Sequence, residues 1–213
     1  MGLAGVILAA GESTRMGRDK ALLPWPPESA NVSSMPGGTL LSSAIDALGR
    51  YCDLVIVVAG KNELSLRPVV YGSGASLARN PSPELGQFSS LQTGLREVLN
   101  RGRDEAMVTL VDRPPARHET LLLLVTEFRG RGHDIWAVIP EYQNKHGHPI
   151  LVGRELIEAF LRYPVTANAR QVEHEHQQGI RYLAVNDAQV TTNVDTPEDY
   201  ASVQSSLSSS RKI

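Results

Sequence analysis

Short apolar runs recur along the chain and alternate with segments of helical periodicity. Continuous runs that are typical of strands buried on both faces of a sheet lie at residues 5–10, 54–59, 107–111 and 136–139, and a further strand is predicted at 180–185. A run at 149–152 fits one strand of a hairpin, and residues 69–71 fit a short strand. The pattern therefore predicts a sheet with fully buried central strands.

Helices are predicted between these strands. Thr39 fits the N-cap of a helix that runs to about residue 50 and places apolar residues on one face. Further helices are expected at 89–100, at 118–128, at 154–161 and from Thr196-Pro197 onward. Because helices alternate with strands, we expect one α/β domain, a Rossmann-like three-layer sandwich with a mostly parallel central sheet.

Two segments lack a core pattern. Residues 25–38 contain three prolines and two glycines and are expected to form a mobile loop. The Ser-rich residues 205–213 include few apolar side chains, so we expect a flexible C-terminal tail after a domain that spans residues 1–204.

Composition narrows the class of protein. The chain has 213 residues and a formal net charge of −2, which argues against a basic field for nucleic acid or acidic membranes. Aromatic residues make up 5% of the chain, too few to suggest a base-stacking surface. Cys52 is the one cysteine, and no apolar run approaches the ~20 residues that cross a bilayer. We therefore expect a cytoplasmic protein.

Polar residues follow the first predicted strand, at the edge of a parallel sheet where ligands bind. In the segment Leu-Ala-Ala-Gly-Glu-Ser-Thr-Arg-Met-Gly-Arg-Asp-Lys (8–20), Gly11 and Gly17 flank small hydroxyl residues. Backbone N–H groups can approach a ligand there, and Arg15 and Lys20 add positive charge, as a triphosphate requires. The spacing is neither that of a Walker A loop nor that of the dinucleotide fingerprint. As a loop lysine, Lys20 is expected to be exposed.

The same segment, continuing into Leu22-Leu23-Pro24, resembles the signature of the MobA-like nucleotidyltransferases. That family includes molybdenum cofactor cytidylyltransferases, which the chain resembles most, and guanylyltransferases. Four further motifs extend the resemblance over nearly the whole chain: Asn80-Pro81 with Gly86-x-x-Ser89-Ser90-Leu91-x-x-Gly94-Leu95, Val111-Asp112-Arg113-Pro114, Gly147-His148-Pro149 and Val194-Asp195-Thr196-Pro197-Glu198-Asp199. The resemblance implies the nucleotide-diphospho-sugar transferase type of α/β fold.

The resemblance also implies a set of nucleotide-binding residues. They are Leu8, Ala9, Ala10, Gly11, Ser13, Arg15, Gly17, Lys20, Asn80, Ser89, Ser90 and Gly94. Arg15 and Lys20 would bind the β- and γ-phosphates and act in catalysis together with Asp112. The segment around Ser89 and Ser90 would contact the nucleobase and ribose.

Two aspartates are candidate ligands of Mg²⁺. Asp112 ends a buried strand, where a carboxylate can hold a hard cation or cap the helix that follows. The resemblance favours the metal role and implies Asp195 as the second carboxylate. Asp195 also precedes Thr196-Pro197, so capping is its alternative role, and Asn193 could share the metal site.

Histidines and one arginine suggest the acceptor side. His146 and His148, like His174 and His176, form pairs without a third zinc ligand and are weak metal candidates. By resemblance His148 lines the acceptor pocket, although a histidine satisfied inside a hairpin fits equally well. Arg113 departs from the family pattern, and it either contacts an anionic acceptor or faces solvent.

The implied activity is Mg²⁺-dependent transfer of a nucleoside monophosphate from an NTP to a phosphorylated acceptor, with release of pyrophosphate. With Ala10 the motif reads Leu-Ala-Ala-Gly, which resembles the family's cytidylyltransferases and so implies CTP, and a molybdopterin-type molybdenum cofactor is the favoured acceptor. A sugar or polyol phosphate is the alternative acceptor. A non-catalytic protein that binds nucleotide or cofactor and assists cofactor insertion into a molybdoenzyme, with or without a chaperone, is the alternative class.

Overall fold

A computed structural model describes residues 2–26 and 38–210 of the chain. Within these residues the strands are β1 (Leu3–Leu8), β2 (Leu54–Ala59), β3 (Ser76–Arg79), β4 (Glu105–Leu110), β5 (Ala137–Tyr142), β6 (Lys145–His146), β7 (Ile150–Val152) and β8 (Ile180–Ala184). The α-helices are α1 (Leu40–Gly49), α2 (Glu63–Gly72), α3 (Gln87–Asn100), α4 (His118–Arg129), α5 (Arg154–Arg162), α6 (Ala169–Glu175) and α7 (Pro197–Ser210).

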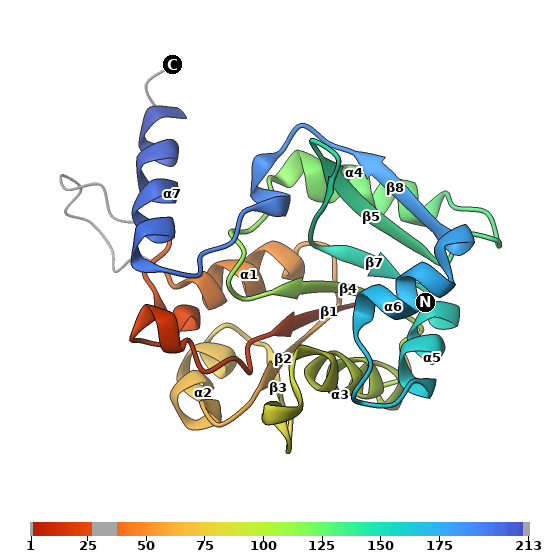
Figure 1. The fold of residues 1–213 in the computed structure, drawn as a ribbon, viewed down its shortest axis with the longest axis horizontal. Coiled ribbons are helices and arrows are strands. Elements are labelled where there is room, and N and C mark those ends of the chain that lie inside the picture. Colours follow the sequence, from red (N-terminus) through yellow and green to blue (C-terminus); the bar gives the residue numbers. More distant parts are fainter. Residues whose placement is uncertain (1, 27–37, 211–213) are drawn as a thin grey trace.

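The strands form a single mixed sheet in the described part of the chain (Figure 1). Their order is β3-β2-β1-β4-β7-β5-β6, and β8 pairs with β5. Neighbours are parallel from β3 through β4 and between β5 and β8, whereas β7 runs antiparallel to β4 and β5. The carboxyl ends of β1 and β4 therefore meet at one edge, which is where the phosphate-rich ligand is expected.

Helices cover both faces of the sheet and confirm the three-layer prediction. Apolar residues of α1, α2 and α4 pack with Ile7 and Val57 on one face. Residues of α3, α5 and α6 pack with Val6 and Val58 on the other. Adjacent strand positions thus face opposite cores, which explains why the central strands are continuous apolar runs.

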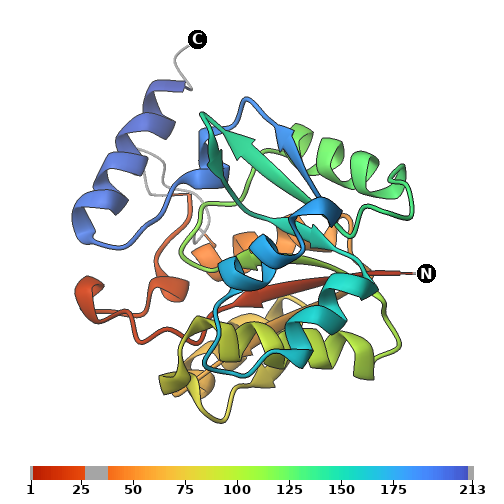
Figure 2. The same ribbon diagram turned by 45° about the vertical axis from the view of Figure 1, so that its right-hand side comes forward.

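The last helix packs against the loop after β1 rather than on the sheet. Figures 1 and 2 show α7 beside the segment that follows β1. The hydroxyl of Tyr200 donates a hydrogen bond of 2.6 Å to the carbonyl of Pro24. A small core completes the contact, formed by Met16, Leu23, Trp25, Leu40 and Val194.

The prediction of a strand at residues 69–71 is wrong, because these residues lie in α2. Leu66 and Val70 bury one face of that helix, and an apolar triplet is too short to distinguish helical from strand periodicity. The strand is β3, an edge strand that is only partly buried and therefore carries a weaker apolar signal.

The structure tests the predictions for the two segments that lack a pattern of buried apolar residues to different extents. Residues 205–210 continue α7, where a flexible tail is expected from composition, and 211–213 lie outside the described residues. Most of the loop expected at 25–38 also lies outside them. Across the parts of the chain that are described, helices are too short or too polar to span a bilayer.

Candidate functional site

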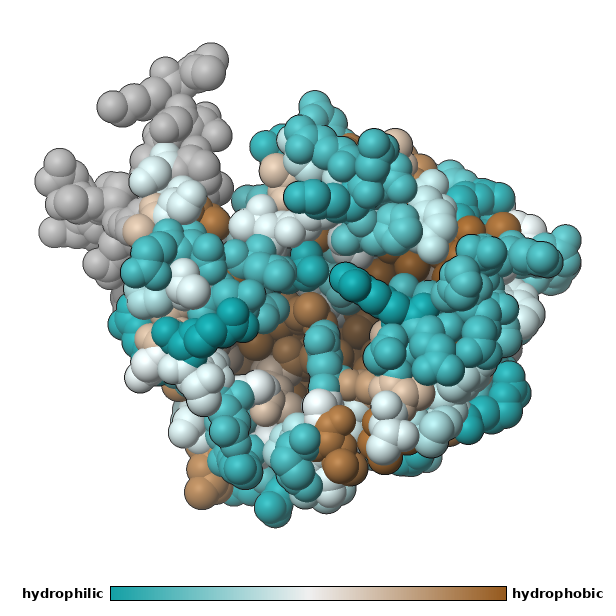
Figure 3. Space-filling model, viewed as in Figure 1, coloured by the Kyte–Doolittle hydropathy of each residue, from teal (hydrophilic) through white to brown (hydrophobic). Residues whose placement is uncertain are grey.

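A cavity of about 260 Å³ opens at the carboxyl ends of β1 and β4. Figure 3 shows a hollow on this face, with an apolar floor and hydrophilic rims. The lining residues are Leu8, Ala10, Gly11, Ser13, Lys20, Pro83, Gly86, Gln87, Ser90, Leu110, Val111 and Asp112. Seven of these are candidates from the sequence, so the first strand, its loop, the start of α3 and the end of β4 meet as the resemblance implies.

The segment at residues 9–20, which we call the phosphate loop, curls back on itself. Ser13 takes a left-handed conformation with φ of 53°, and Gly17 ends a short 3-10 helix with φ of 72°. The backbone N–H of Lys20 donates to Ser13 Oγ at 3.1 Å. This bond turns the lysine toward the cavity.

Lys20 joins the two aspartates. Its Nζ lies 2.5 Å from Asp195 Oδ1 and 3.6 Å from Asp112 Oδ2. The expectation of an exposed lysine is wrong, since Lys20 is 9% exposed. Arg15 remains largely exposed, with Nη2 3.8 Å from Asp195 Oδ1. The site therefore gathers two cations and two carboxylates at the cavity mouth.

The structure assigns the capping of the last helix to residues other than Asp195. Asp199 accepts the N–H groups of Asp195 and Thr196 at 3.0 and 2.9 Å, and these bonds lower the pKa of its carboxyl. Thr196 Oγ1 accepts the N–H of Asp199 in return, a reciprocal capping box. The carboxylate of Asp195 is therefore directed to Lys20.

Asp112 does not cap the next helix either, because α4 begins at His118 with Arg117 as its N-cap. The carbonyl of Asp112 accepts the N–H of Val194 at 2.8 Å, which places the segment containing Asp195 beside it. The Oδ1 atom of Asp112 is buried and has no hydrogen-bond partner among the described residues.

This donor set fits a hard divalent cation. A buried carboxylate oxygen without a partner is costly unless a cation or proton satisfies it. Over residues 2–26 and 38–210, histidine, cysteine and carboxylate side chains do not gather in groups of three or more that could hold a metal. Asp112 and Asp195 would thus supply two ligands and leave the remaining positions to phosphate oxygens and water, as is usual for Mg²⁺.

Asn80 and Ser89 lie behind the cavity wall rather than on it. Asn80 is 3% exposed, and its Nδ2 donates to Ser89 Oγ at 2.8 Å and Ser90 Oγ at 2.9 Å. Its Oδ1 accepts the N–H of Ser82 at 3.0 Å. Asn80 thereby fixes the start of α3 against the loop before it, and Ser90 presents its hydroxyl group at the cavity.

Three further nucleotide-binding candidates have packing roles in the structure. A Cβ on Gly94 would lie 2.6 Å from Val6 Cγ1, so the glycine allows α3 to approach the sheet closely. The backbone N–H of Ala9 donates a hydrogen bond to the carbonyl of Val58, which extends the pairing of β1 with β2. Gly17 supplies the turn that ends the short helix of the phosphate loop.

Sequence reasoning missed part of the wall. Gln87, the first residue of α3, lines the cavity, and Leu110 lines it from the end of β4, next to Val111 of the predicted motif. Their signal is positional: Gln87 follows Gly86 at a predicted ligand-binding loop, and Leu110 precedes the metal candidate.

Arg113 and His148 converge on one carbonyl group. Val190 O accepts Arg113 Nη1 at 2.9 Å and the backbone N–H of His148 at 2.8 Å. A Cβ on Gly147 would lie 2.4 Å from that oxygen, so glycine is required for the contact. Arg113 is therefore anchored against the segment at Val190 rather than extended into solvent.

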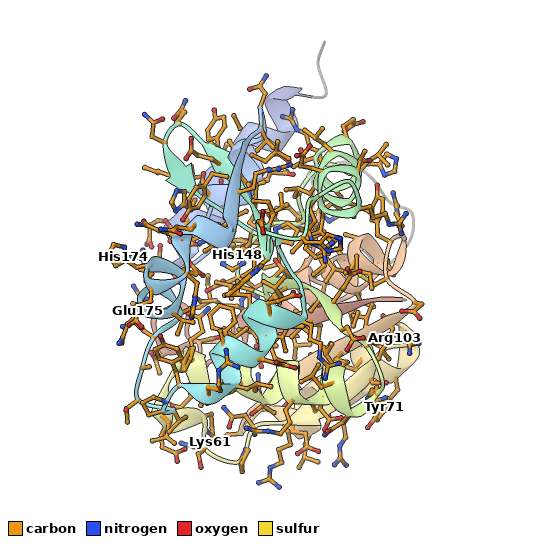
Figure 4. The ribbon with its side chains drawn as sticks, turned by 90° about the vertical axis from the view of Figure 1, so that its right-hand side faces the viewer. Lys61, Tyr71, Arg103, His148, His174 and Glu175 are labelled. Atoms are coloured by element: carbon orange, nitrogen blue, oxygen red, sulfur yellow. The ribbon has the colours of Figure 1, made fainter. Side chains whose placement is uncertain are left out.

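The ring of His148 is neutral at neutral pH. Burial and the nearby Arg113 lower its pKa to about 4, and Nδ1 lies 3.3 Å from the carbonyl oxygen of Val108. Figure 4 shows His148 in the interior, whereas the labelled His174 lies at the periphery. His146 stacks on Tyr182 with ring centroids 3.9 Å apart, an arrangement typical of packing rather than of zinc binding.

Comparisons with known proteins find relatives that match nearly the whole chain. A protein from Rhodopirellula baltica described as a probable molybdenum cofactor guanylyltransferase is 31% identical over 92% of this chain and 89% of its own. The Escherichia coli molybdenum cofactor cytidylyltransferase is 27% identical over 92% of both chains. The crystal structure of Rv0371c from Mycobacterium tuberculosis matches with a TM-score of 0.77 and 25% identity over 96% of this chain and 98% of that one.

A second structure of the Mycobacterium tuberculosis protein, in complex with manganese, matches with a TM-score of 0.74 and 24% identity over 97% of this chain and all of that one (100%). The names of these relatives, and the fold that the chain shares with the solved structures, identify it as a nucleotidyltransferase. The family model of the MobA-like NTP transferase domain, which describes the family's sequence pattern, matches residues 5–180 of this chain. The chain belongs to the MobA-like NTP transferase family.

Proposed function

We propose that this chain transfers CMP from CTP to the phosphate of a molybdopterin-type molybdenum cofactor. An acceptor oxygen forms a bond to the α-phosphorus while the bond between that phosphorus and its bridge to the β-phosphate breaks. Pyrophosphate leaves in line. An ionised phosphate oxygen is already nucleophilic, so positioning and charge stabilisation carry the reaction without a general base. The convergence of Lys20, Asp112 and Asp195 at the cavity mouth supports this proposal best.

The cations of the phosphate loop bind the part of the nucleotide that becomes the leaving group. Lys20 is shielded from water, which strengthens its attraction to phosphate oxygens. Arg15 is exposed and can rotate toward the same oxygens. Both side chains stabilise the charge that builds on pyrophosphate as its bond to the α-phosphorus breaks.

Asp112 and Asp195 would hold Mg²⁺. When bound, such an ion neutralises phosphate charge and keeps the triphosphate in one geometry. The unpartnered Oδ1 of Asp112 supports this role, and the manganese complex of the Mycobacterium tuberculosis relative is consistent with it. Lys20 is bonded to Asp195, so we expect it to exchange this carboxylate for phosphate oxygens when the nucleotide and metal bind.

One residue of the cavity wall supports the choice of cytosine. Ala10 lines the cavity together with Leu8 and Ser90, and a methyl group at this position would leave less room for a purine than a glycine would. One methyl group is worth about 1–3 kcal/mol of discrimination, enough for a preference for CTP over GTP. One curated relative is named a guanylyltransferase and another a cytidylyltransferase, so the relatives do not distinguish GTP from CTP. The proposed preference for CTP therefore rests on Ala10.

The acceptor side is cationic and pre-formed. Arg113 is held by Val190 and directed by the same loop as Asp112, which suits an anionic acceptor. The neutral His148 can accept or donate a hydrogen bond without adding charge. The reaction would take place in the cytoplasm, and the product would pass to a molybdoenzyme or its chaperone.

Pyrophosphate release tests the proposal. The chain is incubated with Mg²⁺, each of the four NTPs in turn, and either molybdopterin-type cofactor or a sugar or polyol phosphate. Rapid release with CTP and the cofactor is expected, and release is abolished in Asp112→Asn but retained in the matched surface variant Asp46→Asn. Tight NTP binding without turnover on any acceptor would instead identify a non-catalytic binding protein.

A further inference from the structure

Asn62 follows β2 and stands at the N-cap of α2, a position where asparagine normally binds the first backbone N–H groups of its own helix. In the described structure its side chain makes no such bond. Asn168 provides the contrast within the same chain, since it caps α6 by accepting the N–H of Gln171 at 2.9 Å. The side-chain amide of Asn62 instead forms hydrogen bonds outside its own helix.

That amide joins both ends of the phosphate loop. Its Nδ2 donates to the carbonyl of Ala9 at 2.9 Å and to Asp19 Oδ2 at 2.8 Å. Its Oδ1 accepts the N–H of Gly60 at 3.1 Å, which fixes the orientation of the amide. The side chain of Asn62, at the N-cap of α2, thus holds together the first residue of the loop and the residue before Lys20.

Asp19 transmits this constraint to Lys20. Its other carboxylate oxygen accepts the N–H of Ala21 at 3.0 Å and caps the 3-10 helix Lys20–Leu22, which Lys20 begins. Asp19 does not line the cavity. A carboxylate next to the phosphate-binding lysine would repel a triphosphate if it could turn inward, so its attachment to Asn62 also keeps negative charge out of the site.

We propose that Asn62 is a positioning residue that clamps the phosphate loop and directs Lys20 toward the triphosphate. The inference rests on the proposed function, because an NTP is the ligand that Lys20 would bind. This clamp affects nucleotide binding rather than the transfer step, because it orders the loop and keeps the carboxylate of Asp19 turned away from the cavity. It should therefore govern NTP affinity more than affinity for the acceptor.

The test compares Asn62→Ala and Asn62→Asp with the matched control Asn168→Ala. Aspartate keeps the acceptor for Gly60 and remains a good N-cap, but it removes both donated bonds. We expect both Asn62 variants to weaken binding of CTP with Mg²⁺ by about tenfold or more in calorimetry, since one lost bond goes to a charged group. The KM for CTP should rise with little change in the acceptor KM. Asn168→Ala should bind CTP as the wild type does.

A double variant distinguishes repulsion of the nucleotide by a released Asp19 carboxylate from a general loss of structure in the loop. Asn62→Ala combined with Asp19→Asn removes the released charge, so we expect it to recover part of the CTP affinity that Asn62→Ala loses. Amide hydrogen exchange gives a readout without ligand: Ala21 and Leu22 should exchange faster in Asn62→Ala than in Asn168→Ala.

The outcomes separate this inference from the proposed function. Wild-type turnover together with equal CTP affinity in the Asn62 and Asn168 variants would overturn the clamp alone. CTP binding by the wild type without transfer to any acceptor would overturn the proposed function, while the affinity and exchange measurements would still decide the clamp. Unchanged exchange at Ala21 in Asn62→Ala would overturn the clamp whether or not NTP binds.

Discussion

The carboxylate of Asp187 accepts a hydrogen bond of 2.9 Å from the hydroxyl of Thr120, and both groups are buried. The same carboxylate accepts the N–H groups of Arg117 and Gln189 at 2.8 and 3.1 Å. These bonds fasten the segment before Val190 to the start of α4. The carbonyl of Val190 accepts hydrogen bonds from Arg113 and His148, so the position of these two residues depends on a buried carboxylate that does not line the cavity.

Asp187→Ala should be strongly destabilising. The substitution leaves two backbone N–H groups and a buried hydroxyl without their acceptor, which costs roughly 2–4 kcal/mol. Urea denaturation of the variant measures the change in the free energy of unfolding. The exposed Asp134→Asn variant is the control, and a loss as small as the control's would contradict the anchoring role.

Lys20→Met should lower kcat/KM for CTP at least about 100-fold, because the transition state loses a shielded cation beside the leaving group. Steady-state kinetics of the variant measure this loss. The variant should also be less stable without metal, since Asp112 and Asp195 would face each other unneutralised. Mg²⁺ should restore stability in a thermal melt. Near-normal turnover, or stability that does not respond to Mg²⁺, would contradict the assignment.

His148 should make stability depend on pH. Its folded-state pKa of about 4 lies below the ordinary value of 6.5, so the unfolded chain binds more protons between these values. Stability is full above pH 6.5 and is lost as pH falls toward 4, by about 2 kcal/mol at pH 5. Comparing His148→Gln with the wild type by chemical denaturation at pH 7 and pH 5 isolates this contribution. An identical pH response in both proteins would show that the ring is not buried as described.

Glu173 should have the opposite pH dependence. Burial raises the pKa of its carboxyl to about 7, so the folded protein retains a proton that the unfolded chain has lost above pH 4.5. Stability therefore falls as pH rises through this window. Glu173→Gln should stabilise the protein by up to about 3 kcal/mol at pH 8 and have little effect at pH 4. Thermal melts at the two pH values measure the difference, with the exposed Glu198→Gln as control.

The elements with a complete local signal could be predicted from the sequence. Thr39 caps α1 through the N–H of Ser42, as its position before an amphipathic segment indicates. The strand at 54–59 has the predicted bounds, because a run of branched apolar residues ended by glycine leaves few alternatives. Where the pattern was short, as at residues 69–71, the same reasoning failed.

Many residues of the candidate site could be predicted from the sequence, but the contacts that these residues make with one another could not. The motifs around Lys20, Asp112 and Asp195 are recognisable by their resemblance to those of the family. Spacing could not decide whether each aspartate caps a helix or faces a ligand. That choice depended on Arg117, which is the N-cap of α4, and on the capping box that Thr196 and Asp199 form at the start of α7.

The sequence by itself determined the strands and helices that have a clear periodicity, and it indicated candidate residues for a phosphate-rich ligand, because periodicity and side-chain chemistry are properties of neighbours in the chain. Only the tertiary structure decided that Lys20 is shielded between two aspartates, that Asn62 bonds both Ala9 and Asp19, and that Asp187 anchors the segment before Val190. Those contacts join residues up to 175 positions apart, and nothing local records which partner a buried polar group will meet.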